Sequence, residues 1–176
     1  MRATRRLVHV MVLAALAAAP ALALALAADK KPIPVSDEID LKGNIEHPRV
    51  LRLADLQAET ATTVQVFFST GSGPVGATFT GVPLWALLQK ATIKPDPNVN
   101  NGGLQHTLAV AATDGYRVVF STGELDPKFG AAGAVLAYAQ DGKPLDAQTG
   151  GFARLILPGD KAGGRNVSSV VSIEVQ

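Results

Sequence analysis

The 176-residue chain contains no cysteine, and this absence excludes two kinds of structure. Disulfide bonds cannot form, so a hydrophobic core alone must stabilise the fold. Metal sites built on thiolate ligands are excluded as well. Histidine is scarce: beyond the N-terminal segment only His47 and His106 occur, and neither stands at the spacing of a zinc or copper site. No Gly-x-Ser-x-Gly motif occurs, so nothing supports a serine hydrolase.

The chain also lacks an excess of positive charge. Its formal net charge is +1, and this falls to −2 when Arg2, Arg5 and Arg6 of the N-terminal segment are set aside. Nucleic-acid binding requires a basic face that attracts phosphates. We therefore expect no nucleic-acid partner.

What is present begins with the pattern of a secretory signal. Three arginines precede an apolar run over Leu7–Leu26, and Ala25-Leu26-Ala27 offers small residues at the spacing that a signal peptidase reads. A retained membrane anchor is the alternative, and Thr4-Arg5-Arg6 leaves the twin-arginine route open. We predict a signal peptide over 1–27, a linker over 28–35, a single domain over 36–176, and a periplasmic or secreted protein.

The remaining chain favours β-structure with many turns, since the sequence holds 17 glycines and 11 prolines. One helix is expected from Pro83 to Lys90, with Pro83 as its first residue and Leu84, Leu87 and Leu88 on one face. A helical turn is expected over 54–57, and Asp114-Gly115 predicts a hairpin. We predict an α+β fold: a mixed β-sheet core with few short helices. The expected strands cover 39–41, 50–53, 63–68, 78–80, 107–112, 116–121, 134–139, 154–157 and 167–175.

Five short motifs occur in an order that is typical of one protein family. They are Phe79-Thr80-Gly81-Val82-Pro83-Leu84, Asp114-Gly115-Tyr116, Asp141-Gly142-Lys143-Pro144-Leu145, Arg154-Leu155-Ile156-Leu157-Pro158-Gly159 and Gly164-Arg165-Asn166-Val167. Together they cover nearly all of the domain and resemble the molybdopterin-binding domain of the sulfite oxidase family. The resemblance implies that family's fold around a pyranopterin.

The same resemblance implies a difference in chemistry. Enzymes of that family hold molybdenum through a cysteine on the loop that precedes the helix, and here that loop is Phe68–Pro74, which has no cysteine. A serine hydroxyl stays protonated near neutral pH and does not replace a thiolate freely. This chain is also similar to small periplasmic proteins of the same fold that bind a pterin. Those proteins pass the pterin signal to a membrane-bound partner, and the partner controls cyclic-di-GMP.

A pterin-type ligand needs an apolar or stacking wall, polar groups along its edge, and cationic or N–H donors for a phosphate. The glycine-rich segment 69–76 could form an anion-binding nest or a plain turn. Arg154 could bind a phosphate or close the strand with a salt bridge, and Arg165 could cover an anionic tail or stay solvated. The predicted ligand-binding residues are Ser69, Thr70, Gly71, Ser72, Gly73, Trp85, Tyr116, Arg154 and Arg165.

Two of these candidates have other roles open to them. Trp85 could stack on a ring or fill the core, and Tyr116 could reach a ligand or pack as an ordinary strand residue. We interpret the chain as an exported domain that binds a pterin or molybdopterin-like ligand, without cysteine-ligated molybdenum. We expect it to act non-catalytically on a partner protein, for example a membrane-bound periplasmic sensor. Two alternatives stay open. One is a molybdopterin-dependent oxidoreductase with a non-cysteine metal site, and the other is an interaction protein with an empty pocket.

Overall fold

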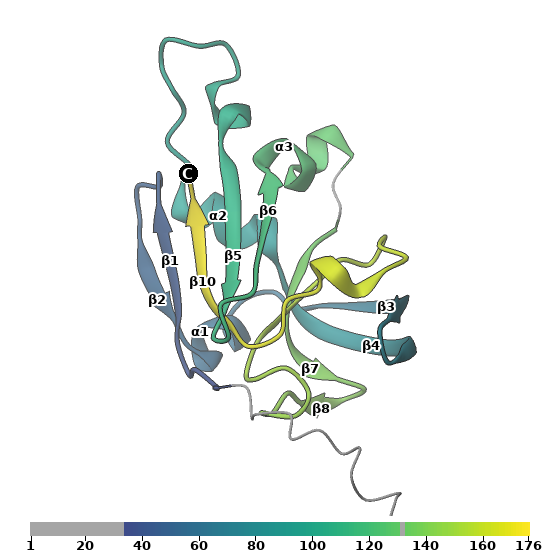
Figure 1. Ribbon diagram of the computed structural model, residues 1–176. Coiled ribbons are helices and arrows are strands. Elements are labelled where there is room, and N and C mark those ends of the chain that lie inside the picture. Colours follow the sequence, from purple (N-terminus) through teal and green to yellow (C-terminus); the bar gives the residue numbers. More distant parts are fainter. Residues whose placement is uncertain (1–33, 131–132) are drawn as a thin grey trace, which may run out of the picture. The chain divides into compact units, whose positions relative to one another are not determined.

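Two five-stranded sheets make up the domain in the computed structural model, which describes residues 34–130 and 133–176 (Figure 1). The predicted signal peptide and most of the predicted linker lie outside the described residues. In the first sheet the strands run in the order β2-β1-β10-β5-β6, and in the second β3-β4-β7-β8, with β9 also paired to β7. The strands are β1 (Ile39–Gly43), β2 (Arg49–Leu51), β3 (Thr62–Thr70), β4 (Gly73–Pro83), β5 (Thr107–Ala112), β6 (Arg117–Ser121), β7 (Val135–Gln140), β8 (Lys143–Pro144), β9 (Arg154–Ile156) and β10 (Val170–Val175).

The pairing is antiparallel except between β1 and β10, which run parallel. The first sheet is therefore mixed and the second is antiparallel, and the predicted α+β class is confirmed. Helices are few and short, and no described helix is long and apolar enough to cross a membrane. They are α1 (Leu53–Gln57), α2 (Leu84–Ala91), α3 (Thr122–Leu125) and the 3-10 helices η1 (Gly102–Gln105), η2 (Pro127–Phe129) and η3 (Gly163–Arg165).

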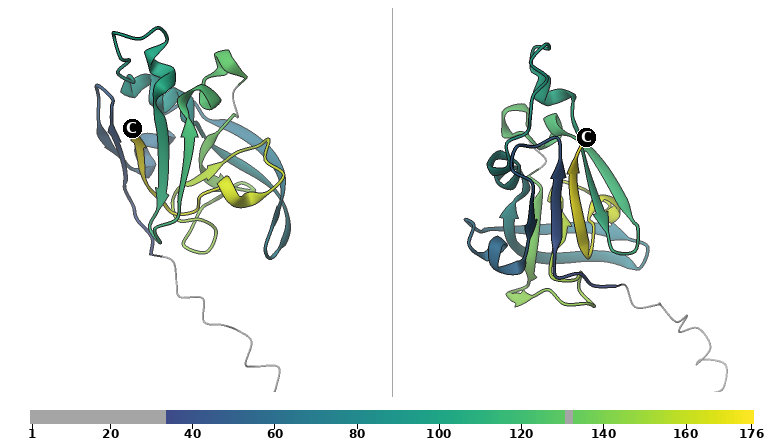
Figure 2. Two further views of the ribbon diagram at one scale, coloured as in Figure 1. Left: turned by 45° about the horizontal axis from the view of Figure 1, so that its top comes forward. Right: turned by 90° about the vertical axis from the view of Figure 1, so that its left-hand side faces the viewer.

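Two apolar clusters form the core, one on each side of β7. Alternate strand residues point to opposite faces, so Leu136 joins the larger cluster, whereas Val135 and Ala137 join the smaller one. The larger cluster lies among the first sheet, α2 and one face of the second sheet. The smaller one covers the other face of the second sheet. Figure 2 shows the two sheets from two further directions. Because β7 and β9 have apolar residues on both faces, they are the most deeply buried part of the second sheet.

The helix prediction is correct in its apolar face and wrong in its first residue. Leu84, Leu87 and Leu88 are fully buried as expected. Pro83, however, ends β4 with extended backbone, and the helix begins at Leu84. The N–H of Leu84 donates to the carbonyl of Ala134, so strand pairing with β7 holds the chain extended up to that point.

The prediction of a glycine-rich loop over 69–76 is wrong in its extent. β3 continues to Thr70 and β4 begins at Gly73, which leaves only Gly71 and Ser72 in the turn. The expected brief strand over 78–80 is part of this long β4. Pairing between the two strands therefore overrides the preference of glycine and proline for loops.

Candidate functional site

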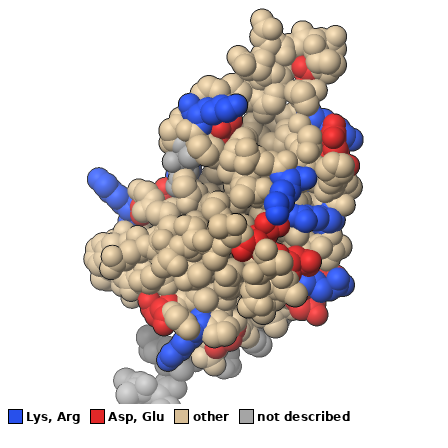
Figure 3. Space-filling model, turned by 180° about the vertical axis from the view of Figure 1, so that it is seen from behind, with Lys and Arg blue, Asp and Glu red and all other residues tan. Residues whose placement is uncertain are grey.

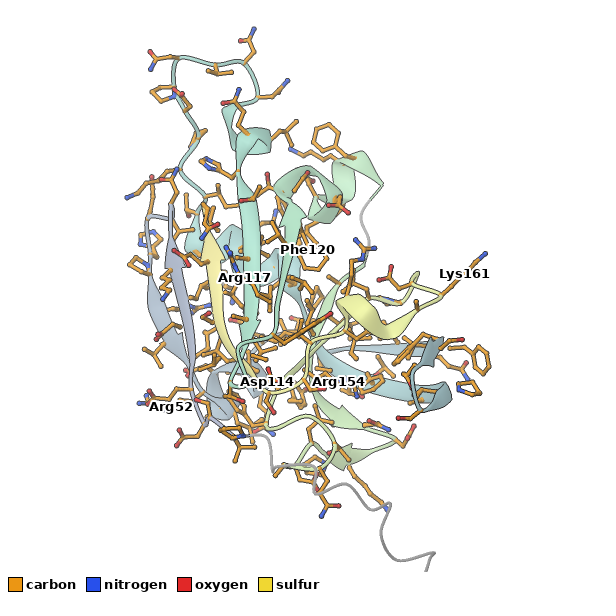
Figure 4. The ribbon with its side chains drawn as sticks, in the orientation of Figure 1. Arg52, Asp114, Arg117, Phe120, Arg154 and Lys161 are labelled. Atoms are coloured by element: carbon orange, nitrogen blue, oxygen red, sulfur yellow. The ribbon has the colours of Figure 1, made fainter. Side chains whose placement is uncertain are left out.

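Arg154 opens the buried strand β9 and faces the smaller apolar cluster. It pairs with Ala137 on β7, and its guanidinium carbon lies 5.5 Å from the centre of the Phe79 ring. The alternation of β9 explains this direction, since Leu155 enters the larger cluster and Ile156 the smaller one. Figure 4 shows Arg154 inside the domain, whereas Lys161 extends away from it.

Arg154 is half-buried, and no described carboxylate compensates its charge. Its Nε atom has no hydrogen-bond partner among the described residues, and none of the described carboxylates forms an ion pair with it. Burial lowers the pKa of the guanidinium from its ordinary value, although arginine remains protonated in proteins. Partial burial of a cation without an anionic partner costs free energy, part of which an anion placed beside it would recover.

A hollow of about 290 Å³ opens beside this guanidinium. Apart from Arg154 its walls carry no charge: amides, hydroxyls, a glycine and two apolar side chains line it. An anionic ligand would therefore meet one cation and no carboxylate. The lining residues are Val75, Gln140, Ala147, Gln148, Thr149, Gly150, Arg154, Ser168 and Ser169.

The loop that walls this hollow is held by Asp146. One carboxylate oxygen of Asp146 accepts from the N–H groups of Gln148 and Thr149 and from the Thr149 hydroxyl, at 2.8–2.9 Å. The hydrogen bond from the Thr149 hydroxyl is the largest of the effects that lower the pKa of Asp146. Gly150 then adopts φ +137°, and a Cβ there would stand 3.1 Å from Cδ of Arg154. Only glycine lets this loop approach the arginine so closely.

A second orphaned donor lies next to β9. Asn166 is buried, and its side-chain oxygen accepts from the N–H of Leu157 at 2.8 Å. Its Nδ2 atom has no partner among the described residues. Two residues further on, Ser168 and Ser169 line the hollow, so both orphaned donors belong to the structure around β9.

Arg165 has the opposite environment. Its Nε and Nη2 atoms donate to the two oxygens of Asp160 at 2.8 and 2.6 Å, and Nη1 donates to Glu124 at 3.1 Å. The guanidinium also lies over the ring of Phe120, 5.5 Å from its centre. The pairing with Asp160 raises the pKa of Arg165. In this arrangement Arg165 ties the η3 loop to β6 and α3 and has little capacity left for a ligand.

Three donors of the glycine-rich segment are also occupied. The Thr70 hydroxyl donates to the carbonyl of Gly73 and accepts from the N–H of Ser72, and the N–H of Ser69 donates to the carbonyl of Lys161. A Cβ on Gly163 would stand 2.9 Å from the ring of Phe68, so β3 packs directly on the η3 loop. These groups form a tight hairpin in place of the expected open loop, and an anion-binding role for them stays a prediction.

Trp85 and Tyr116 lie elsewhere. Trp85 is half-buried and lines a separate hollow of about 270 Å³ with Ile93, Leu104 and Phe129 among others. The Tyr116 hydroxyl donates to the carbonyl of Gly164. The predicted site residues thus separate into three places, and only Arg154 lines the hollow described above.

Sequence reasoning missed the residues that accompany Arg154, namely Gln140, Gln148, Thr149, Ser168 and Ser169. One signal was available: Thr149-Gly150-Gly151 stands shortly before a buried strand that starts with arginine. Gln148 stands directly before this motif, whereas Gln140, Ser168 and Ser169 come from other segments and meet it only in the fold. Within 34–130 and 133–176, no group of three or more His, Asp or Glu side chains is placed to hold a metal ion.

Comparison with known proteins agrees with this architecture. A model of the oxidoreductase molybdopterin binding domain matches residues 30–176. The chain belongs to this family. Among solved structures it is similar to the sulfane dehydrogenase SoxCD from Paracoccus pantotrophus, with a TM-score of 0.66 and 22% sequence identity. That match covers 82% of this chain and 40% of the other, so the likeness supports the fold alone. No curated protein matches the sequence.

The residues present fit one part of the group that this family binds. The orphaned Arg154 and the hydroxyls of Ser168 and Ser169 suit an anionic, oxygen-rich tail such as a phosphate. They do not fit the thiolate link to a metal, because the chain has no cysteine.

Proposed function

We propose that this domain binds a pterin-type ligand, with its anionic tail beside Arg154, and that it acts without catalysing a reaction. The observation that carries this proposal is the half-buried Arg154, which lines the hollow and whose enclosed Nε has no partner among the described residues. A phosphate in the hollow would offer oxygens to the guanidinium, and hydrogen bonds of this charge-assisted kind are about twice as strong as neutral ones. Family membership supports a molybdopterin-type ligand over other anions.

The hollow has the composition expected for such a ligand. Its volume of about 290 Å³ stands at the lower end of the range for small-molecule sites, which suits a phosphate-bearing tail with the ring system extending outward. Arg154 would pair with the phosphate, and the hydroxyls of Ser168 and Ser169 would complete its hydrogen bonds. Bound molybdopterin supplies redox chemistry when it carries molybdenum, but this chain adds no thiolate ligand to that metal.

The non-catalytic part of the proposal rests on the residues around the hollow. Apart from Arg154, which stays protonated, its lining includes no side chain that titrates near neutral pH. Nothing there can donate or accept a proton in a reaction of the ordinary acid–base kind. A ligand held in this way would serve as a bound signal, and we propose that a membrane-bound periplasmic protein reads it.

Native mass spectrometry tests the ligand directly. The full-length gene, with its own N-terminal segment and a C-terminal tag, is expressed in a bacterium that makes molybdopterin, and the purified protein is weighed intact. We expect extra mass and the fluorescence of a pterin after acid release. Protein that carries neither, and that no added phosphate-bearing pterin stabilises against heat, would overturn the proposal.

Elemental analysis of the same sample separates binding from enzymatic function. We expect molybdenum far below one atom per chain. A value near one would favour the alternative, an oxidoreductase with a non-cysteine metal site.

We also propose export across the cytoplasmic membrane, on the charge and hydropathy pattern of the first 27 residues. Cell fractionation with N-terminal sequencing tests it. The expected product starts close to Ala28 and lies in the periplasm, whereas an uncut cytoplasmic chain would contradict the proposal.

A further inference from the structure

The strand β3 forms an unprotected edge of the second sheet. Its inner side pairs with β4 along its whole length, from Thr62 with Gly81 to Thr70 with Gly73. On its outer side the only β-bridge among the described residues is near its C-terminal end, where Ser69 pairs with Ala162. In Figure 1 the hairpin of β3 and β4 extends from the body of the domain with β3 outermost in its sheet. The edge from Thr62 to Phe68 is therefore open.

The outward-facing backbone groups of this edge can be identified. The N–H of Ser69 donates outward to Lys161, so by alternation the N–H and C=O groups of Thr63, Gln65 and Phe67 also point away from β4. Their side chains are exposed, and the ring of Phe67 is 73% accessible. An open edge with three free donor–acceptor residues is a template for another strand.

The strands at the other sheet edges are short or contain charged residues or proline, and these features prevent pairing with another strand. β2 has three residues and includes Arg49, β6 includes Arg117, and β8 consists of Lys143 and Pro144. By contrast, β3 has nine residues without a charge or a proline, and no charged residue occurs anywhere between Glu59 and Lys90. Since 18% of the chain is charged, a stretch of this length without a charged residue differs from the rest of the sequence. Figure 3 shows acidic and basic side chains interspersed over the back of the molecule.

We propose that β3 pairs antiparallel with β3 of a second copy of this chain, about a twofold axis at Gln65. This register places Thr63 opposite Phe67 of the other copy and Gln65 opposite Gln65, so aromatic, β-branched and amide groups meet and no like charges do. About six inter-strand hydrogen bonds would form. The register uses only the open part of the edge, because Ser69 is already occupied.

A second copy fits this edge better than a charged partner segment would. An edge that is free of charge pairs with itself without repulsion, and a twofold contact closes on itself, so it limits assembly to a dimer. The two second sheets would join into one continuous sheet. The inference is independent of the ligand proposed above, because Arg154 lies on β9, which β4 and β7 separate from β3.

The absence of cysteine makes a direct test possible. Full-length chain carrying Gln65→Cys has a single thiol, and in the proposed register the two introduced thiols face each other across an antiparallel pair, with Cα atoms about 5.5 Å apart. Mild oxidation should then give a covalent dimer. The matched control is Phe67→Cys, whose two thiols would lie about 14 Å apart and should stay unlinked. Equal cross-linking of both variants, or of neither, would overturn the register.

Sedimentation measurements on the unmodified chain test the dimer itself. We expect a dimer, and we expect Gln65→Lys to weaken it at least tenfold, because two lysines would face each other. Thr78→Lys is the control, since Thr78 faces Gln65 from the inner strand β4 and does not reach the edge. A monomer at all concentrations, or equal weakening by both lysines, would disprove pairing through this edge. Pairing of the edge with another protein's strand instead would also overturn the proposal.

Discussion

Arg154 and Arg165 stand eleven positions apart, and only the guanidinium of Arg165 is paired with carboxylates among the described residues. Arg165 is 41% exposed at its side chain and makes ion pairs with Asp160 and Glu124. Arg154 is more deeply buried, yet its Nε finds no partner among the described residues. Arginine normally reaches the interior only with its charge compensated. The comparison therefore assigns Arg165 to the stability of the η3 loop and favours Arg154 as the residue of the proposed ligand site.

The largest effect is expected from Arg154→Met, which keeps most of the side-chain volume and removes the charge. Affinity for a phosphate-bearing pterin should fall roughly 10- to 100-fold, since hydrogen bonds to a charged group contribute about 1.5–3 kcal/mol. Isothermal titration calorimetry measures this loss.

The unliganded stability of the same variant is the internal control. Replacing an uncompensated buried charge with an apolar group should leave the free energy of unfolding unchanged or higher. Arg154→Lys should retain part of the affinity, as lysine keeps the charge without the planar fork. Unchanged affinity in Arg154→Met, with lowered stability, would assign Arg154 to the fold and remove the contrast with Arg165.

Gly150→Ala should act on the same site through the backbone. Gly150 has φ +137°, and an added Cβ would contact Arg154 at 3.1 Å. We expect a loss of about 1–2 kcal/mol in the free energy of unfolding and weaker ligand binding. Urea denaturation and calorimetry provide the two readouts. Gly164→Ala, where a Cβ meets nothing within 4 Å, is the matched control and should change neither.

Arg165→Gln should destabilise the domain and leave ligand affinity within about twofold. Because the ion pairs are partly exposed, solvent screening limits their contribution to about 1 kcal/mol or less, and added salt should reduce it. Thermal unfolding at low and high salt measures the effect. If affinity falls as strongly as in Arg154→Met, the two arginines share one function and the comparison fails.

The smallest effect concerns the acid titration of Asp146. Its folded-state pKa lies below the ordinary carboxyl value, so its contribution to stability is present above the unfolded-state pKa and is lost as pH falls through the folded-state pKa. The amide protons of Gln148 and Thr149 should therefore keep their chemical shifts until the pH is below the usual carboxyl range. NMR titration follows them, and a transition at the ordinary pKa would mean that the loop is not held as described.

Local patterns predicted much of the fold and a small part of the site. The spacing of Leu84, Leu87 and Leu88 identified α2, the longest of the described helices, and β-branched runs identified most strands. The start of that helix was wrong because Pro83 is held in strand pairing with β7, which is a contact between distant segments. The glycine-rich segment was assigned to a loop for the same reason, since its pairing partner decides its conformation.

The sequence by itself determined the chemistry that is absent and the fold class. Without cysteine there is no thiolate for a metal, and the order of strand and turn patterns leads to a mixed α+β domain. Only the tertiary structure decided which arginine is satisfied, because Asp160, Glu124 and Phe120 reach Arg165 from different elements, whereas the loop 146–151 and Ser168 surround Arg154 with uncharged groups. Whether a charge is compensated depends on distances of a few ångströms between segments, which chain order does not specify.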